Sequence, residues 1–252
     1  MKNLLSLITV LTKKEFKVRY KGSFLGYLWA IVHPLMFAFV FYIAFKAVMK
    51  VQIENYTIFL ISALFAWQWF AGAIVLSSTS YLANAQIVKK IKFPRYILPL
   101  SNILMESLHF IISIPVIIFF LYIYNVQPNY LMILAYSPVL MLLQIMFMFG
   151  LSLIFSSVNV FFRDTERLLS VGILLWFYVT PIIYSIELIP SEYSQYMCLN
   201  PMIPFIESWR HLFIEGTIET QYIPSMIISG LTTMLVGSFV YNKLKYKFTE
   251  VL

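Results

Sequence analysis

The sequence predicts an all-α integral membrane protein with six transmembrane helices, because of its composition, its repeated apolar segments and the placement of its charges. Of the 252 residues, 61% are hydrophobic and only 12% are charged, about half the charged fraction of an average soluble domain. The repeated apolar segments match the ~30 Å hydrocarbon core of a bilayer at ~1.5 Å per residue. A soluble globular class is therefore excluded, and the net charge of +7 points to membrane topology, not to nucleic-acid binding.

Six segments are predicted to cross the membrane, within a single domain over residues 1–252. They lie at residues 28–49, 57–83, 97–124, 131–158, 169–184 and 222–241. Fifteen of the 18 Lys and Arg residues then fall on one side, in the N-terminal arm, the 84–96 loop, the 159–168 loop and the C-terminal tail. Because cationic loops remain in the cytoplasm, both termini are expected to be cytoplasmic.

The N-terminal arm, residues 3–21, is predicted to be an amphipathic helix at the membrane surface. Its apolar residues at helical spacing are Leu4, Leu7, Ile8, Leu11 and Val18, and its cations would face the headgroups. An ordinary cytoplasmic arm is the alternative. No small-residue cleavage site follows the apolar stretch, so the arm is expected to be retained. Gly22 and Gly26 indicate either a close helix contact or a flexible corner, and their boundary position favours the corner.

Residues 185–220 are predicted to be external, yet they are not hydrophilic. Asn200 is a plausible N-cap with Pro201 at the first helical position, and Gly216 is a stop signal. Two interpretations stay open. The segment forms short re-entrant helices, whose backbone ends protein or water must cover, or it forms an amphipathic helix on the outer surface.

The sequence contains no catalytic constellation. It lacks the G-x-x-x-x-G-K-[ST] phosphate-binding loop, and its three histidines and single cysteine are scattered, so neither a cofactor nor a metal is expected in this chain. The third predicted span carries one polar stripe at helical spacing, made of Asn102, Glu106, His109 and Ser113.

An intramembrane carboxylate indicates a functional or paired group. The stripe would line a translocation path near its cytoplasmic end, or it would form a buried hydrogen-bonded seam in which Glu106 pairs with Arg163 or Arg167. The seam is favoured slightly, because a cationic loop lies nearby and one carboxylate needs no substrate.

Aromatic residues make up 18% of the chain. Flat aromatic faces stack against the C–H faces of sugar rings, so a belt of them around a lumen would let a glycan pass. Membrane anchoring and core packing are the alternative for each residue singly. The candidate glycan-lining residues are Trp29, Tyr42, Phe45, Trp67, Trp69, Trp176 and Tyr178.

Several segments in order resemble one family. They are FKVRYKGSFLGYLWAIVHPL (16–35), IVKKIKFPRYILPLSNI (87–103), VFFRDTERLL (160–169), YVTPIIY (178–184) and NPM (200–202). Together they resemble the membrane subunits of type-two ABC exporters of cell-surface polysaccharide, and most closely those for O antigen. The resemblance implies a homodimer in the inner membrane, a lipid-linked polysaccharide substrate, and a separate ATPase dimer that carries ATP and Mg.

The resemblance also implies roles for three groups of residues. Residues 84–96 would form a coupling helix on the ATPase, with contacts from Lys89, Lys90, Phe93, Pro94 and Arg95. A purely topogenic loop would explain the lysines but not the rigid apolar Phe93-Pro94 tip. A gate at the cytoplasmic mouth would comprise Arg163, Asp164, Glu166 and Arg167, with the two carboxylates capping or pairing. Arg19 and Lys21 would bind the lipid diphosphate, with anionic phospholipid as the competing ligand.

Other functions remain open at this stage. Exporters of capsule, teichoic acid, a small lipid or a drug would use the same scaffold. A membrane-embedded glycan-processing enzyme would need an acid or base at the lipid–water boundary, for which Glu187, Glu192 and Glu207 are available. A secondary carrier would work without ATP.

Overall fold

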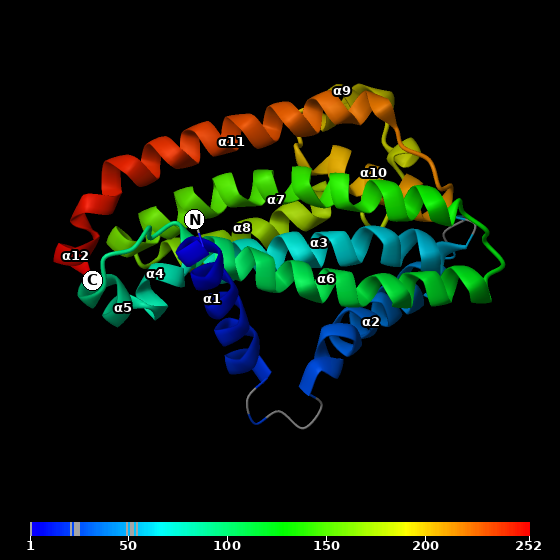
Figure 1. Cartoon of the computed structure of the whole chain (residues 1–252). Helices are drawn as coiled ribbons and strands as arrows, with labels where there is room; N and C mark the ends of the chain where they lie inside the picture. Colours follow the sequence, from blue (N-terminus) through cyan, green and yellow to red (C-terminus); the bar gives the residue numbers. More distant parts are fainter. Residues whose placement is uncertain (1, 21, 23–25, 49, 51–52, 54) are drawn as a thin grey trace.

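The computed structural model describes residues 2–20, 22, 26–48, 50, 53 and 55–252, and within them it contains helices and no strand. Long helices lie side by side in one bundle, and α1 and α2 project from one face of it and approach each other away from it (Figure 1). The helices are α1 (Lys2–Tyr20), α2 (Trp29–Phe41), α3 (Tyr56–Ser78), α4 (Ser80–Ala83), α5 (Ala85–Lys90), α6 (Ile97–Ile123), α7 (Tyr130–Phe161), α8 (Thr165–Val179), α9 (Ser191–Met197), α10 (Met202–Ile214), α11 (Ile223–Leu244) and α12 (Phe248–Val251).

Four described segments are long and apolar enough to cross a membrane: α3, α6, α7 and the stretch Thr220–Val251 that contains α11. The first predicted span is divided between α2 and a π-helix over Tyr42–Val48. The fifth is the 15-residue α8, which ends at Val179, because Pro181 cannot continue a helix. The second ends at Ser78 and not at 83, since α4 is a separate short helix.

The N-terminal arm is helical as predicted, and α1 packs against α6 with Leu11 buried. Gly22 and Gly26 have φ angles of +75° and +48°, in the left-handed region that favours glycine. A Cβ at either would meet no atom within 4 Å. The φ angles of the two glycines are those of a corner, and neither glycine is in a close helix contact with the described residues. Lys21 lies outside the described residues.

Helix α3 is the centre of the bundle, in contact with α2, α6, α7, α8 and α10. Helix α11 packs along α7, and glycines let the two backbones approach closely. A Cβ on Gly150 would overlap the backbone of Thr233, and one on Gly237 would overlap the carbonyl of Gly150. The Thr233 hydroxyl also donates to the Phe147 carbonyl across this interface, at 3.3 Å.

Helix α10 begins one residue later than predicted, at Met202 with Pro201 at the N-cap, and it ends at Ile214, just before the predicted stop. The Asn200 side chain accepts a hydrogen bond from the Met202 amide at 3.0 Å, and Gly216 follows the helix with a φ of +68°. Most side chains of α10 are buried, including the large Trp209. The helix packs against α3, α6 and α7, so it belongs to the interior of the bundle (Figure 1).

Candidate functional site

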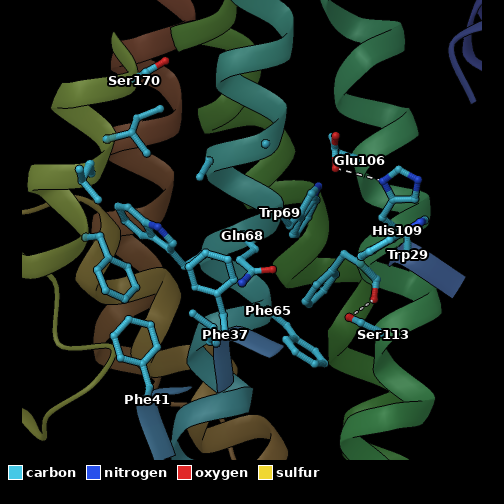
Figure 2. Close-up of a pocket in the computed structure, with 18 of the residues that line it drawn as sticks. Trp29, Phe37, Phe41, Phe65, Gln68, Trp69, Glu106, His109, Ser113 and Ser170 are labelled. Atoms are coloured by element: carbon cyan, nitrogen blue, oxygen red, sulfur yellow. Dashed lines mark hydrogen bonds and ion pairs between the residues drawn. The ribbon is translucent and has the colours of Figure 1, made fainter. Parts of the chain in front are cut away.

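A cavity of about 650 Å³ lies where α1 and α2 leave the bundle, and side chains from α1, α2, α3, α6 and α8 form its walls. Its lining is dominated by aromatic rings, with a polar group at one end (Figure 2). Rings at its wall are held by stacking. Trp69 stacks on Phe110 with centroids 4.7 Å apart and planes 12° apart, and Phe41 stacks on Phe177 at 5.5 Å.

Four of the seven predicted glycan-lining aromatics line this cavity: Trp29, Trp67, Trp69 and Tyr178. The other three, Tyr42, Phe45 and Trp176, are not among its lining residues. The Trp176 indole instead donates to Asn200 Oδ1 at 2.8 Å, and Asn200 donates to the Thr180 hydroxyl at 3.0 Å. Asn200 thus joins the segment NPM to Thr180 of the segment YVTPIIY, and Trp176 supports the same link.

Trp69 has an unpaired hydrogen-bond donor that is buried within the cavity wall. Its side chain is almost completely buried, and its indole Nε1 has no hydrogen-bond partner among the described residues. Buried indole N–H groups ordinarily find an acceptor. The neighbouring Ser113 hydroxyl is already used, since it donates to the Phe110 carbonyl at 2.7 Å.

The polar end of the cavity is an ion pair that joins α1 to α6. Arg19 donates to Glu106, and His109 Nδ1 lies 3.1 Å from the second Glu106 oxygen. Gly72 on α3 leaves room for the carboxyl group, which a Cβ there would meet at 3.2 Å. Asn102, the remaining residue of the predicted stripe, donates to the Leu76 carbonyl at 3.1 Å.

The predicted partner of Glu106 was therefore wrong. Arg163 and Arg167 are exposed at the start of α8 and form no ion pair within the described part of the chain. Asp164 and Glu166 are also exposed, and Asp164 stands at the N-cap of α8 without a side-chain capping bond. The gate residues predicted from RDTER thus form an exposed group of four charges, of both signs, on one turn.

The coupling segment is less helical than the predicted 84–96 helix. Helix α5 ends at Lys90, and the chain from 91 to 94 is not helical, because the residue before a proline is driven away from the α conformation. Lys89, Lys90 and Pro94 are exposed, while Phe93 is half-buried. Arg95 donates to the Lys245 carbonyl, and its guanidinium lies 5.9 Å from the centroid of the Phe248 ring.

Sequence reasoning missed a buried polar network around α10. Arg210 pairs with Glu207, donates to the Pro181 carbonyl at 2.7 Å and lies 3.8 Å from the Phe59 ring centroid. Burial lowers the pKa of Arg210, and the Glu207 carboxylate opposes that shift. Since Glu207 is buried in this pair, it is not an acid available at a lipid–water boundary. The i, i+3 spacing of the two residues was the signal that could have revealed the pair.

A second buried link connects three helices. Trp209 donates to Gln144 Oε1 at 2.8 Å, and Gln144 Nε2 donates to the Ala66 carbonyl at 3.2 Å. All three residues are fully buried. This link positions α10 against α3 and α7 and so fixes the wall behind the cavity.

The comparisons with known proteins agree with this architecture. The sequence matches the ABC-2 type transporter family over residues 6–214. It is 49% identical to the O-antigen export system permease protein RfbA of Klebsiella pneumoniae, over 99% of this chain and 96% of that protein.

More distant relatives are also similar along nearly their full length. The identity is 29% to RfbA of Myxococcus xanthus, over 97% of this chain and 94% of that protein. It is 23% to the polysialic acid transport protein KpsM of Escherichia coli, over 93% of this chain and 92% of that protein. The family match and the first relative extend over most of the fold, and on these grounds the chain belongs to the ABC-2 type transporter family.

Proposed function

We propose that this chain is the permease subunit of an ATP-driven exporter that moves lipid-linked O-antigen polysaccharide across the inner membrane. The observation that carries the substrate class is the aromatic cavity, with its half-exposed rings and its charged end. The relatives named as O-antigen permeases support the choice of O antigen. A polysialic acid transporter is more distant in sequence, which makes a capsular glycan the second candidate.

The cavity chemistry suits a moving glycan. Half-exposed rings such as Trp29 and Tyr178 offer flat faces to the apolar faces of sugars, whereas Trp69 and Phe110 are almost completely buried in the wall. Such contacts are individually weak and similar for successive sugars. The glycan would slide along the wall without being held at one position.

A homodimer would complete the wall of this cavity. Trp29, Phe37, Leu174 and Tyr178 line the cavity although each is 43–57% exposed. A second copy that packs its own α2 and α8 opposite would enclose them. In this arrangement α2 with its π-helix and α8 serve as the first and fifth of six spans, and α10 is a re-entrant helix whose ends are covered by protein.

The charged end is suited to receive the lipid diphosphate. Arg19 is 45% exposed at its side chain although it pairs with Glu106, so a diphosphate would exchange with Glu106 for the guanidinium. With both termini in the cytoplasm, as the cation distribution favours, Arg163 and Arg167 would stand on the same side and attract the anion.

Power would come from a separate ATPase dimer that binds ATP and Mg. The exposed Lys89, Lys90 and Pro94, with Phe93 behind them, would be its contact on this chain. Because Arg95 donates to the Lys245 carbonyl, a movement of residues 91–96 that the ATPase causes would be transmitted to the end of α11.

A transport assay tests the substrate proposal. The permease and its ATPase are purified together and reconstituted in vesicles with lipid-linked O-antigen polysaccharide, and ATP-driven movement of the glycan is measured. Tyr178→Ala, in the cavity, is expected to slow transport by about fivefold or more, because a stacking face is lost. One stacked ring contributes about 1–3 kcal/mol by analogy with aromatic stacking on bases, and 1.4 kcal/mol is about tenfold. Tyr122→Ala is the matched control, since Tyr122 is 78% exposed and does not line the cavity.

Two results would count against the proposal. Equal transport rates of the Tyr178→Ala and Tyr122→Ala variants would show that the glycan does not pass through the cavity. Faster transport of a capsular glycan than of O antigen would favour the second candidate. Coupling is measured separately with Phe93→Ala/Arg95→Ala, which is expected to lose ATPase co-purification or glycan-stimulated hydrolysis. An absence of any associated ATPase with the unaltered chain would refute the ATP-driven mechanism.

A further inference from the structure

A second cavity, also of about 650 Å³, is lined by residues 91–96 of the predicted coupling segment. It is a groove between residues 91–96, α7, the last turns of α11 and the chain that follows α11. Figure 1 shows these parts gathered at the end of the bundle that holds the C-terminus. None of its lining residues belongs to the aromatic cavity, so the glycan path leaves the groove unexplained.

The rim of the groove is cationic. Lys92, Arg95 and Lys245 line it, and no Asp or Glu is among its lining residues. Among the described residues, none of these three cations takes part in an ion pair. Lys245 is held by neutral groups, because its ammonium donates to Asn242 Oδ1 at 2.7 Å and lies 5.1 Å from the Tyr246 ring centroid. The groove thus presents positive charge without an internal counter-ion.

The floor of the groove is apolar and reaches along two membrane-spanning helices. Phe149 and Leu153 come from α7, two to three turns before its end, and Tyr241 comes from the last turn of α11. At ~1.5 Å per residue, Leu153 lies on the order of 10 Å below the end of α7 at Phe161. A ligand that satisfies both parts has an anionic head at the rim and a hydrocarbon portion directed into the membrane.

We infer that this groove binds an anionic phospholipid of the inner leaflet, with its phosphate at Lys92, Arg95 and Lys245. Basic pockets between helices at the cytoplasmic boundary fit such headgroups. The cytoplasmic position of the groove rests on the proposed function, whereas its charge and shape do not. The lipid would bridge residues 91–96 to the C-terminal segment, beside the existing bond from Arg95 to the Lys245 carbonyl. It would therefore stiffen the segment through which the ATPase is proposed to act.

The experiment measures lipid retention on the purified permease–ATPase complex by native mass spectrometry. Complexes are titrated with phosphatidylglycerol, with phosphatidylcholine as the neutral lipid. The double variant Lys92→Gln/Lys245→Gln is expected to bind phosphatidylglycerol roughly 30-fold more weakly, from the loss of two cations near the headgroup. Lys243→Gln/Lys247→Gln is the matched control, because it also removes two positive charges, at exposed residues on either side of Lys245 and outside the groove.

Each outcome decides the inference. Selective loss of one phosphatidylglycerol per chain in the groove variant, with normal retention by the control, supports it. Equal loss in both variants, or equal retention of phosphatidylcholine, overturns it. Displacement of phosphatidylglycerol from the groove by millimolar inorganic phosphate would overturn it and assign the groove to a soluble anion. Lipid bound by the permease alone but excluded by the ATPase would assign the groove to the partner. Because retention is read without transport, a failure of the proposed function would leave this result interpretable.

Discussion

Replacing Arg19 with methionine is expected to loosen α1 from the bundle. The change keeps an apolar stem of similar length but leaves Glu106, whose side chain is only 7% exposed, without its guanidinium partner. Removing one partner of a fully buried pair costs about 3–5 kcal/mol, and an exposed pair contributes about 0–1 kcal/mol. Because Arg19 itself is 45% exposed, we expect a loss of about 1–3 kcal/mol.

A double-mutant cycle isolates the pair from other effects of the substitution. Glu106→Gln removes the charge while it keeps an acceptor for Arg19, so it is expected to cost less than Arg19→Met. On the Glu106→Gln background, Arg19→Met should then cost about 1 kcal/mol less than it does alone. Unfolding in detergent would be followed by tryptophan fluorescence, since Trp29 and Trp69 line the same cavity as the pair.

Limited proteolysis gives a second, local readout for α1. The Arg19→Met variant should be cleaved faster within α1 than the unaltered chain, whereas Lys17→Met should not. Lys17 is an exposed cation on the same helix and forms no ion pair among the described residues. Additive energies in the cycle, or equal destabilisation by the two methionine variants, would refute the role of the pair.

Two further predictions concern packing. Gly237→Ala should destabilise the fold by about 1–3 kcal/mol, because the new methyl group overlaps the Gly150 carbonyl. Gly172→Ala is the control and should be neutral or slightly stabilising, because a Cβ there meets open space on α8. The reverse order of melting temperatures would contradict the α7–α11 contact. Trp209→Phe should cost about 1–3 kcal/mol, since it leaves the buried Gln144 oxygen without its donor; an unchanged melting temperature in detergent would show that the link carries no stability.

Local signals in the sequence predicted much of the fold. The start of α10, the stop at Gly216 and the positive φ angles at Gly22 and Gly26 each depend on the conformational preference of a few neighbouring residues. The last two are where the sequence predicted them, and the start of α10 is one residue later. The break in the 84–96 helix could also have been predicted, because the residue before Pro94 is restricted by a local steric rule.

The candidate site depended on contacts that local signals do not encode. Glu106 and Arg19 are separated by 87 positions, and nothing in the helical spacing of α6 shows that α1 packs against it. Charge counting treated Arg210 as an external cation, although it is buried against Glu207 and Phe59. The aromatic residues were predicted as a class, but the packing of α2 and α8 decides which of them line the cavity, as the exclusion of Trp176 illustrates.

The hydrogen bonds of Gln144 set an order for biogenesis. The Gln144 amide can donate to the Ala66 carbonyl once α3 and α7 have been inserted. The amide oxygen has no donor until Trp209 has been synthesised and α10 has packed. Until then the chain holds an unpaired amide oxygen in the bilayer interior, where such groups are costly. The packing of α10 against α7 is therefore expected to complete the pairing of this amide late in assembly.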